Sequence, residues 1–419
     1  MREAGVLQSN SSPGLQTAVF KYIDCAMRFL TTLLALLLLP IRTLAGSMPP
    51  VQTVFIILME NGNWSSIKGS GNAPYINNTL LPMASYCGQY FNPPGLHPSE
   101  PNYLWLEAGT NFGITNDNDP AINHQGTTRH LVTLLQNAGI SWKTYQEDIS
   151  GAYVPLTATN AYAPKHNPFV YFDDVTGTNN RNWAYGIAHI RPYSELAADL
   201  ANNTVARYNF ITPNLCHDGH DSCSPLSNQI KQIDTWLAAQ VPAILNSAAY
   251  QNGGALFITW DEGASSSDGP IGMIVLSPLA RGGGYFNNIH YTHSSTLRTF
   301  QEIFGVPPPL GAHSSTSHTS QEILAVTPPA LLGDAANATD LSDLFSQFGF
   351  SSVVKLPGGG MQLTAVGVIP GRTNLIQASS DLANWVSIST NVVGTNTFTV
   401  TDTTAKNFNR RFYRLAQLP

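Results

Sequence analysis

Two long apolar runs mark the centre of the predicted fold. Residues 51–59 and 254–260 are continuous, rich in β-branched and aromatic side chains, and each run ends in a pair of polar residues. Such runs are typical of central parallel strands covered on both faces. Ligands of open α/β sheets bind at the carboxyl ends of strands, so the two polar pairs are expected to converge there. The pairs are Glu60-Asn61 and Asp261-Glu262.

Helical and strand-like patterns alternate between and after these runs. The periodicity predicts helices over 128–138, 193–201, 226–248 and 293–304, and strands over 140–145, 207–212 and 271–277. This order predicts an α/β domain with a mostly parallel sheet and helices on both sides. The segments 111–125 and 152–191 are long for connections in a compact domain, and we expect them to be loops on the substrate side.

The pattern changes near residue 349. A Pro- and Gly-rich stretch at 355–360 predicts a linker over 349–360, and residues 361–419 alternate apolar and polar positions with turn signals, as antiparallel strands do. We therefore expect a catalytic domain at 46–348 and a small all-β module at 361–419. The module carries no cluster suited to catalysis and resembles small C-terminal modules of secreted bacterial proteins. We interpret it as an appendage that binds or anchors to the cell envelope or serves sorting machinery.

The N-terminal segment has the layout of an export signal. Met27-Arg28 precede an apolar run at 29–40, and small residues before Gly46 offer a cleavage site. The run is too short to span a bilayer comfortably. We predict an export signal at 1–45, with Met27 as a candidate start, an exported periplasmic or extracellular protein, and no transmembrane span in the mature chain. An uncleaved N-terminal anchor is the alternative.

Composition and charge narrow the class of partner. The 419 residues are 43% hydrophobic and 11% charged, which is globular composition, and the formal net charge is −6. An acidic surface does not attract nucleic acid over long range, so no nucleic-acid partner is expected. A small anionic substrate would need a local positive centre such as a metal ion. Cys216 and Cys223 lie close in sequence and predict a disulfide loop in an oxidising compartment, with Cys87 buried and unpaired.

Ser99 lies on a stiff turn. Pro98 precedes it and Pro101 follows it two residues later, and prolines bias their neighbours away from helix, so we expect a helix to begin near Asn102. A serine near a helix N-terminus suits a phosphate or another oxyanion. The alternative is that Ser99 only caps this helix.

Oxygen-bearing side chains favour a divalent cation at the strand ends. Glu60, Asn61, Asp261 and Glu262 all offer oxygen ligands, and Ser99 would complete the shell. A metal beside this hydroxyl would stabilise an alkoxide and neutralise phosphate oxygens. Imidazole titrates near neutral pH, so His217 and His220 would contact phosphate or protonate a leaving group.

Several motifs follow one another in the order of a known family. The chain resembles the bacterial phosphoesterase family of secreted acid phosphatases, phosphatidylinositol-phosphate phosphatases and phospholipases C, within the alkaline-phosphatase-like superfamily. The resemblance spans about residues 51–310 and rests on Met59-Glu60-Asn61, His97-Pro98-Ser99-Glu100-Pro101-Asn102-Tyr103, His166-Asn167-Pro168-Phe169, Pro213-Asn214 with His217-Asp218-Gly219-His220-Asp221, Trp260-Asp261-Glu262-Gly263 and Tyr291-Thr292-His293. One departure is Gly62-Asn63-Trp64, where the family often has His and a small residue.

The resemblance implies an alkaline-phosphatase-like sheet and a site on it. It implies one divalent metal ion (Ca, Mg, Mn, Fe or Zn) held by Glu60, Asn61, Asp261 and Glu262. Ser99 would be the nucleophile that becomes transiently phosphorylated, and His217 and His220 would bind phosphate or serve the leaving group. Substrate contacts would come from Asn102, His97, His166 and His293. A phosphohistidine at His97, His217 or His220 is the alternative to phosphoserine, and His166 and His293 are equally compatible with structural hydrogen bonding.

Three functions compete. The first is a secreted, metal-dependent phosphomonoesterase of acid phosphatase type (EC 3.1.3) that works through a phosphoserine. The second is a phosphodiesterase of phospholipase C type (EC 3.1.4), using the same site. The substrate is accordingly a small phosphorylated molecule or a phospholipid headgroup. The third is a secreted binding protein without activity, and the acidic pairs at buried strand ends argue against it because packing does not require them.

Overall fold

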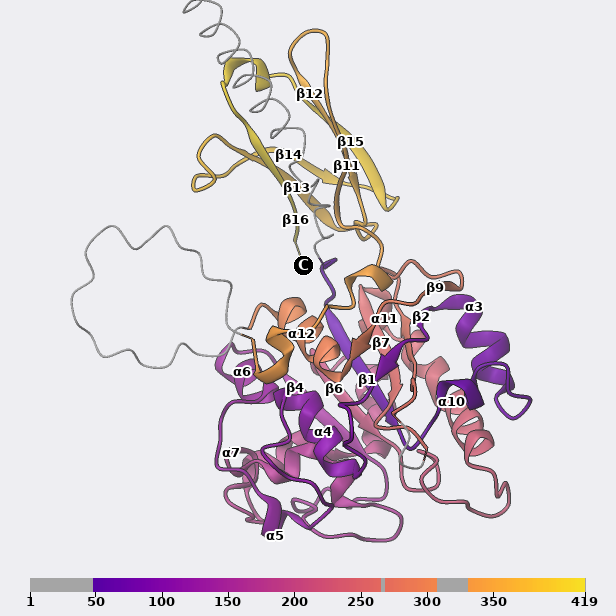
Figure 1. Cartoon of the computed structure of the whole chain (residues 1–419). Coiled ribbons are helices and arrows are strands. Elements are labelled where there is room, and N and C mark those ends of the chain that lie inside the picture. Colours follow the sequence, from indigo (N-terminus) through magenta and orange to yellow (C-terminus); the bar gives the residue numbers. More distant parts are fainter. Residues whose placement is uncertain (1–47, 265–267, 307–330, 419) are drawn as a thin grey trace, which may run out of the picture. The chain divides into compact units, whose positions relative to one another are not determined.

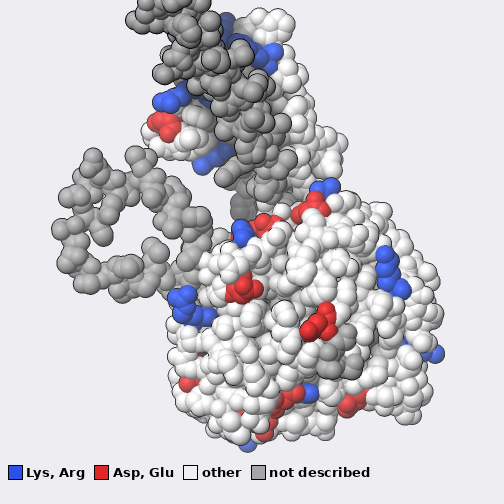
Figure 2. Space-filling view, in the orientation of Figure 1, with Lys and Arg blue, Asp and Glu red and all other residues white. Residues whose placement is uncertain are grey.

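The computed structural model describes residues 48–264, 268–306 and 331–418 (Figure 1). The predicted export signal at 1–45 lies outside these residues. Among the described residues, no helix is both long enough and apolar enough to cross a membrane. On the face drawn in Figure 2, Lys and Arg side chains lie apart from one another rather than in a continuous patch.

An eight-stranded sheet forms the centre of the catalytic part. Its strand order is β5-β4-β6-β1-β7-β8-β2-β9, and β5, β4, β6, β1 and β7 run parallel. Strand β8 is antiparallel to both of its neighbours, and β2 and β9 are parallel. The strands are β1 (Thr53–Met59), β2 (Ser85–Cys87), β4 (Trp142–Gln146), β5 (Ile190–Pro192), β6 (Tyr208–Thr212), β7 (Gly254–Trp260), β8 (Met273–Leu276) and β9 (Tyr285–Asn287). The predicted α/β fold with a mostly parallel sheet is confirmed.

Helices cover the sheet in two groups. Helices α4, α6 and α12 contact one another, and α10 contacts α9 and α11. All seven residues of β7 are buried, as covering on both faces requires. The helices are α4 (Ser99–Ala108), α6 (Leu131–Asn137), α9 (Leu196–Asn202), α10 (Gln229–Leu245), α11 (Ala248–Gln251) and α12 (His293–Phe304). The long loops predicted at 111–125 and 152–191 hold short helices, namely α5 (Pro120–Asn123), α7 (Asp173–Thr176) and α8 (Ala184–His189).

The C-terminal residues form two antiparallel sheets of three strands, β11-β12-β15 and β14-β13-β16. The strands are β11 (Gly349–Lys355), β12 (Met361–Val366), β13 (Thr373–Ser379), β14 (Val386–Val392), β15 (Thr397–Asp402) and β16 (Phe412–Gln417). This confirms the expected all-β module. The linker predicted at 349–360 is corrected in part, because β11 pairs with β12 and the Gly-rich stretch is the hairpin turn between them, with Gly359 at φ +82°. The other domain boundaries stay predictions.

Helix α4 carries a buried carboxyl into the core. The hydroxyl of Tyr208, on β6, donates a 2.6 Å hydrogen bond to Glu107 Oε1, and Glu107 Oε2 has no hydrogen-bond partner among the described residues. Burial raises the pKa of Glu107 to about 8. A carboxyl in this position therefore favours its neutral form.

This burial predicts a pH-dependent gain from Glu107→Gln. The pKa of Glu107 is about 8 in the folded chain and ordinarily 4.5, so folding stability falls as pH rises from 4.5 through 8. Glutamine is neutral at every pH, and its side-chain oxygen still accepts from Tyr208. Between about pH 5 and about pH 9, the unfolding free energy of Glu107→Gln should therefore fall by about 2–4 kcal/mol less than that of wild type. Denaturant titration of the full chain at both pH values measures this. Glu195→Gln, in a partly exposed pair with Arg191, controls for loss of a negative charge. Parallel pH profiles of the Glu107 variant and wild type would contradict the prediction.

Candidate active site

Three neighbouring strands bring the candidate site together. Strands β6, β1 and β7 lie side by side and parallel, so the residues that follow them meet at one edge of the sheet. The backbone N–H of Asn61 donates to Asp261 Oδ1 over 3.1 Å, and the N–H of Gly62 donates to the carbonyl of Glu262 over 3.0 Å. The structure thus joins the two polar pairs that the sequence indicated. At the departure from the family pattern, a Cβ on Gly62 would overlap the Trp260 indole.

Ser99 is the first residue of α4, so the helix begins three residues before the start predicted at Asn102, and Ser99 is buried against Glu60. Its hydroxyl donates to Glu60 Oε2 over 3.1 Å. One turn further along the same helix, the hydroxyl of Tyr103 donates to Glu60 Oε1 over 2.6 Å. A single helix thus holds both oxygens of the Glu60 carboxyl and fixes the direction of the Ser99 hydroxyl.

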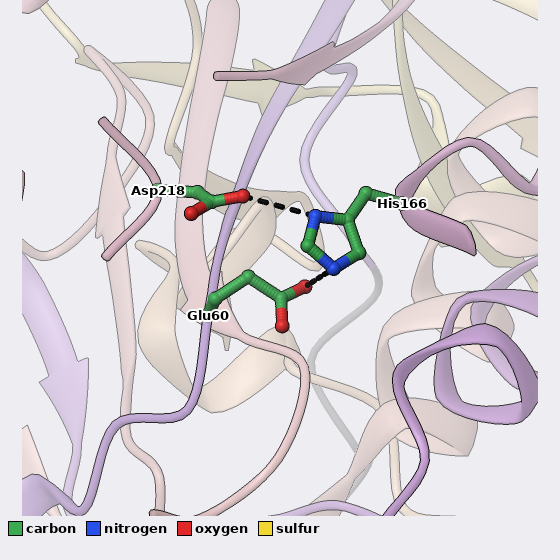
Figure 3. Close-up of side chains that lie close together, drawn as sticks. All are labelled: Glu60, His166 and Asp218. Atoms are coloured by element: carbon green, nitrogen blue, oxygen red, sulfur yellow. Dashed lines mark hydrogen bonds and ion pairs between the residues drawn. The ribbon is translucent and has the colours of Figure 1, made fainter. Parts of the chain in front are cut away.

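Glu60, His166 and Asp218 form a buried group that could hold a metal ion (Figure 3). Glu60 Oε1 lies 3.3 Å from His166 Nε2, and Asp218 Oδ2 lies 3.0 Å from His166 Nδ1. One possible ligand atom from each residue lies within 4.8 Å of the other two. Mixed imidazole and carboxylate ligands suit divalent metals. His166 was predicted to contact substrate, and the sequence analysis did not assign a role to Asp218.

Buried polar atoms without partners make this place suitable for a cation. Asn61 Oδ1, Asp261 Oδ2 and His166 Nε2 are buried and have no hydrogen-bond partner among the described residues. An unsatisfied buried acceptor costs about 1–3 kcal/mol, and native structures contain few of them. The donor set of carboxylates, an amide oxygen and an imidazole therefore fits a divalent ion.

Crowding of carboxylates in a buried place sets the electrostatics. Burial raises the pKa of Glu60 and of Asp218 well above the usual range, and nearby Asp261 adds to both shifts. Burial also raises the pKa of Asp261 to about 6 and that of Glu262 to about 9. The positive charge of Lys165 opposes the shift in all four.

The predicted substrate contacts at Asn102 and His97 lie beside Glu262. Asn102 Nδ2 donates to the carbonyls of Leu96 and Pro98 over 2.9 and 3.0 Å and to Glu262 Oε2 over 3.4 Å. Asn102 therefore braces the turn that carries Ser99. His97 Nδ1 lies 3.8 Å from Glu262 Oε2, and its ring is partly exposed.

His293 faces the backbone rather than open space. Its Nε2 lies 2.6 Å from the carbonyl oxygen of Asp261, and its Nδ1 lies 3.1 Å from the Tyr90 hydroxyl. Burial lowers the pKa of His293 to about 4, so the ring is neutral and Nε2–H donates to Asp261. His293 therefore positions Asp261, which matches the structural alternative for this residue.

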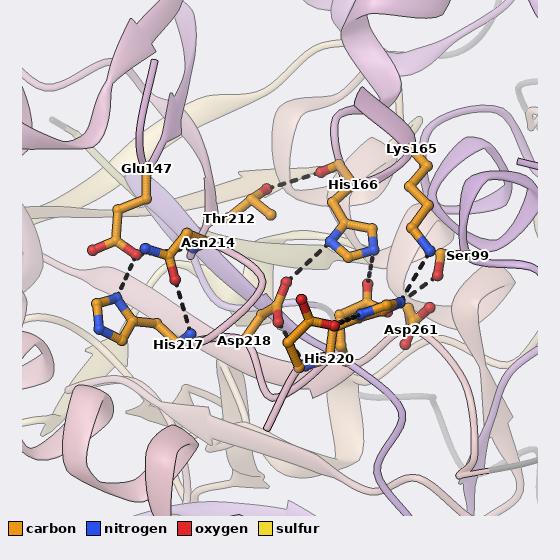
Figure 4. Close-up of polar contacts among 12 residues, drawn as sticks. Ser99, Glu147, Lys165, His166, Thr212, Asn214, His217, Asp218, His220 and Asp261 are labelled. Carbon is orange, nitrogen blue, oxygen red and sulfur yellow. Dashed lines mark hydrogen bonds and ion pairs between the residues drawn. The ribbon is translucent and has the colours of Figure 1, made fainter. Parts of the chain in front are cut away.

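The two histidines of the loop after β6 separate (Figure 4). His220 Nε2 lies 3.0 Å from Lys165 Nζ, at the group of buried carboxylates. His217 instead pairs with Glu147, 2.8 Å from Nδ1 to Oε2, and lines a cavity of about 400 Å³ with Trp236. The N–H groups of His217 and Asp218 both donate to the Asn214 carbonyl, so the chain turns tightly between the two environments. The structure does not bring His217 to Ser99.

The predicted disulfide between Cys216 and Cys223 is present and closes this loop. Cys87 is buried and free, as expected.

Three residues of the site were missed by the sequence analysis. Asp218 lies inside the motif at 217–221, and Lys165 directly precedes the motif at 166–169. These motifs were therefore the signal that could have identified both residues. Tyr103 follows Ser99 by four residues, which is the spacing that places two side chains on one helix face.

The pair of His217 and Glu147 predicts a pH window of stability. The hydrogen bond to Glu147 raises the pKa of His217. Burial acts to raise the pKa of Glu147, but its hydrogen bond to His217 opposes burial, and the net shift of that pKa is downward. The contribution of Glu147 is present above its ordinary pKa of 4.5 and is lost as pH falls. That of His217 is present below 6.5 and is lost as pH rises through the raised pKa.

Glu147→Gln should therefore lower the unfolding free energy most between pH 4.5 and 6.5, by about 1 kcal/mol because the pair is partly exposed. Thermal melts across pH measure the effect. Glu302→Gln, whose partner is Arg298, is the control without a histidine. A loss that stays constant from acid to alkaline pH would contradict the assignment.

Comparisons with known proteins place the chain in a family. The model of the Phosphoesterase family matches residues 76–307, which is more than half of the chain. A phosphatidylinositol-3-phosphatase of Mycobacterium tuberculosis is 31% identical over 263 residues, covering 63% of this chain and 80% of that protein. A probable acid phosphatase of Kluyveromyces lactis is 28% identical over 215 residues, covering 50% of this chain and 47% of that protein. The chain thus spans most of the first relative and about half of the second.

Among solved structures, a protein in the alkaline phosphatase superfamily from Vibrio parahaemolyticus matches with a TM-score of 0.43 and 9% identity, covering 83% of this chain and 86% of that one. The family predicted from the motifs is confirmed by the family model and by the mycobacterial relative. The chain belongs to the Phosphoesterase family and is a hydrolase of phosphoric esters.

Proposed function

We propose that the chain is a metal-dependent phosphomonoesterase that forms a phosphoserine at Ser99. The observation that carries this proposal is the buried Ser99 hydroxyl at the start of α4, 3.1 Å from Glu60 Oε2 and beside the group of carboxylates. The names of two relatives, a phosphatidylinositol-3-phosphatase and a probable acid phosphatase, support a phosphate monoester as substrate.

Glu60 is placed to take the proton of Ser99. Its Oε2 already accepts the hydroxyl hydrogen over 3.1 Å, so the ionised carboxyl group is in place to take that proton as the serine attacks. Ser99 Oγ then forms a bond to phosphorus while the ester oxygen of the alcohol leaves, and water releases phosphate from the serine in a second displacement. The Tyr103 hydroxyl donates to the other oxygen of Glu60 and keeps the carboxyl group in place.

The metal would be held where the buried oxygens gather. We propose Glu60, Asn61, Asp261 and Glu262 as ligands, as the family resemblance implies, and add His166 and Asp218 from the geometry. A divalent ion bound there would neutralise charge on the transferring phosphoryl group.

His220 is the histidine of the two that can serve the leaving group. Its ring lies at the site, whereas His217 faces a separate cavity. His97 and Asn102, next to Glu262, are in place to approach the substrate.

We also propose that the protein is exported and that its all-β module binds or anchors to the cell envelope. The disulfide between Cys216 and Cys223 supports an oxidising compartment.

Ser99→Ala should lower kcat/KM for a chromogenic phosphate monoester by at least about 10³-fold, because the covalent step loses its nucleophile. The monoester and the matching diester are assayed across pH on the full chain. Ser247→Ala is the control, since Ser247 caps α11 before β7 begins, at the opposite edge of the sheet. Full activity of Ser99→Ala would move the nucleophile to His97 or His220. A preference for the diester would replace the proposal by the phospholipase C-type reaction.

Asp261→Asn should reduce the divalent metal that copurifies with the protein, because a buried carboxylate ligand is lost. Elemental analysis of the purified chain measures metal per protein, and a chelator should abolish monoester hydrolysis by wild type. Asp148→Asn is the control, because the Asp148 carboxylate accepts from Asn214 in an exposed place. Unchanged metal content in Asp261→Asn, or full activity of chelated wild type, would contradict the metal assignment.

A further inference from the structure

We propose that Lys165 binds the phosphate group of the substrate, and that His220 and Asp117 hold its ammonium group ready for this contact. The inference rests on the proposed phosphomonoesterase function and adds a substrate-binding residue to that site. It arises from the charge balance of the site and from the partners of the Lys165 side chain.

Once its carboxyl groups are ionised, as metal binding requires, the site carries more negative charge than one divalent ion offsets. Glu60, Asp218, Asp261 and Glu262 supply four carboxyl groups, and a phosphate monoester enters as a dianion at neutral pH. An ion of charge +2 leaves an ionised set of carboxylates and its substrate strongly negative in a buried place, where such charge is costly. A further cation at the site would offset part of this charge.

Lys165 is a cation whose charge acts on all four of these carboxyl groups. It is the second residue of the short helix η2 (Pro164–His166) and directly precedes His166 in the Glu60 group. Its side chain is 21% exposed, so it is open to an incoming ligand. Figure 4 shows it pointing toward Asp261 and His220.

The present partners of Lys165 leave most of its charge available. Nζ donates to His220 Nε2 over 3.0 Å, and His220 Nδ1 lies 2.8 Å from Asp221 Oδ1. The ammonium group can only donate, so Nε2 accepts from Lys165. A dianionic phosphate oxygen is a stronger acceptor than an imidazole nitrogen.

The other partner of Lys165 is a weak ion pair. Nζ lies 3.3 Å from Asp117 Oδ2, and the Asp117 side chain is 31% exposed. Asp117 Oδ1 also accepts from the N–H of Glu100, next to Ser99 at the start of α4. Asp117 therefore connects Lys165 to the helix of the nucleophile and keeps the ammonium group on the substrate side.

The competing explanation is that Lys165 only stabilises the fold through its pair with Asp117. Asp117→Asn separates the two explanations. Asparagine can still accept from Glu100 N, but it removes the charge that pairs with Lys165. If Lys165 acts only through its ion pair with Asp117, Asp117→Asn should weaken phosphate binding as much as a Lys165 variant does. If the cation itself binds phosphate, Asp117→Asn should lower phosphate affinity less than Lys165→Met does, because Asp117 only positions the ammonium group.

The test measures binding of inorganic phosphate by titration calorimetry, in full-length protein that carries Ser99→Ala and therefore does not turn over. Adding Lys165→Met should weaken phosphate binding about 10- to 100-fold, as expected for loss of one charged hydrogen bond. Lys165→Arg should recover part of the affinity. Lys143→Met removes a lysine of similar exposure that pairs with Asp199 and should leave binding unchanged. Thermal melts and metal content are measured for each variant.

Three results would overturn the inference. These are phosphate affinity within twofold of the parent in Lys165→Met, an equal loss in Asp117→Asn, or a loss that is explained by a fall in metal content. The test is separable from the proposed function, because phosphate binding does not require turnover. A wild type that hydrolyses no monoester would refute the function, while the calorimetry would still decide whether Lys165 binds phosphate.

Discussion

The burial of carboxyl groups at the ends of β1 and β7 and in the loop after β6 is the constraint on which the site depends. Glu60 and Asp261 lie in the interior, away from water, and their charged forms are costly there. The surrounding structure offsets this cost in part with aimed donors: the Ser99 and Tyr103 hydroxyls on Glu60 and the Asn61 N–H on Asp261. The oxygens that stay without donors are those that a cation would satisfy. The same buried carboxyl groups therefore suit binding of a cation but reduce the folding stability of the chain.

Helix α4 converts that constraint into a defined geometry. Ser99, Asn102 and Tyr103 occupy positions i, i+3 and i+4, so they share one face of the helix. The Ser99 and Tyr103 hydroxyls donate to the two oxygens of Glu60, while the Asn102 amide donates to a carbonyl of the preceding turn. At the other end of the helix, Glu107 is buried against Tyr208 of β6. Ser99 is thus fixed in position by packing along the whole helix.

The loop after β6 divides its side chains between two environments. Asp218 and His220 face the buried carboxyl groups, and His217 faces the cavity beside Trp236. The tight turn at Asn214 and the disulfide between Cys216 and Cys223 set this division. Two histidines only three residues apart consequently have different roles open to them.

The sequence by itself determined the strands that build the site, because buried runs that end in polar pairs have few explanations in packing. It likewise determined the helix near Ser99, the disulfide and the all-β tail, since proline position, cysteine spacing and alternation act locally. The tertiary structure alone decided the partners that come from separate loops. His166 and Lys165 reach the site from a long loop, and His217 turns away from it, because the direction of a loop side chain depends on packing against distant segments. The stretch at 349–355 paired as a strand for the same reason, since pairing needs a partner that local pattern does not supply.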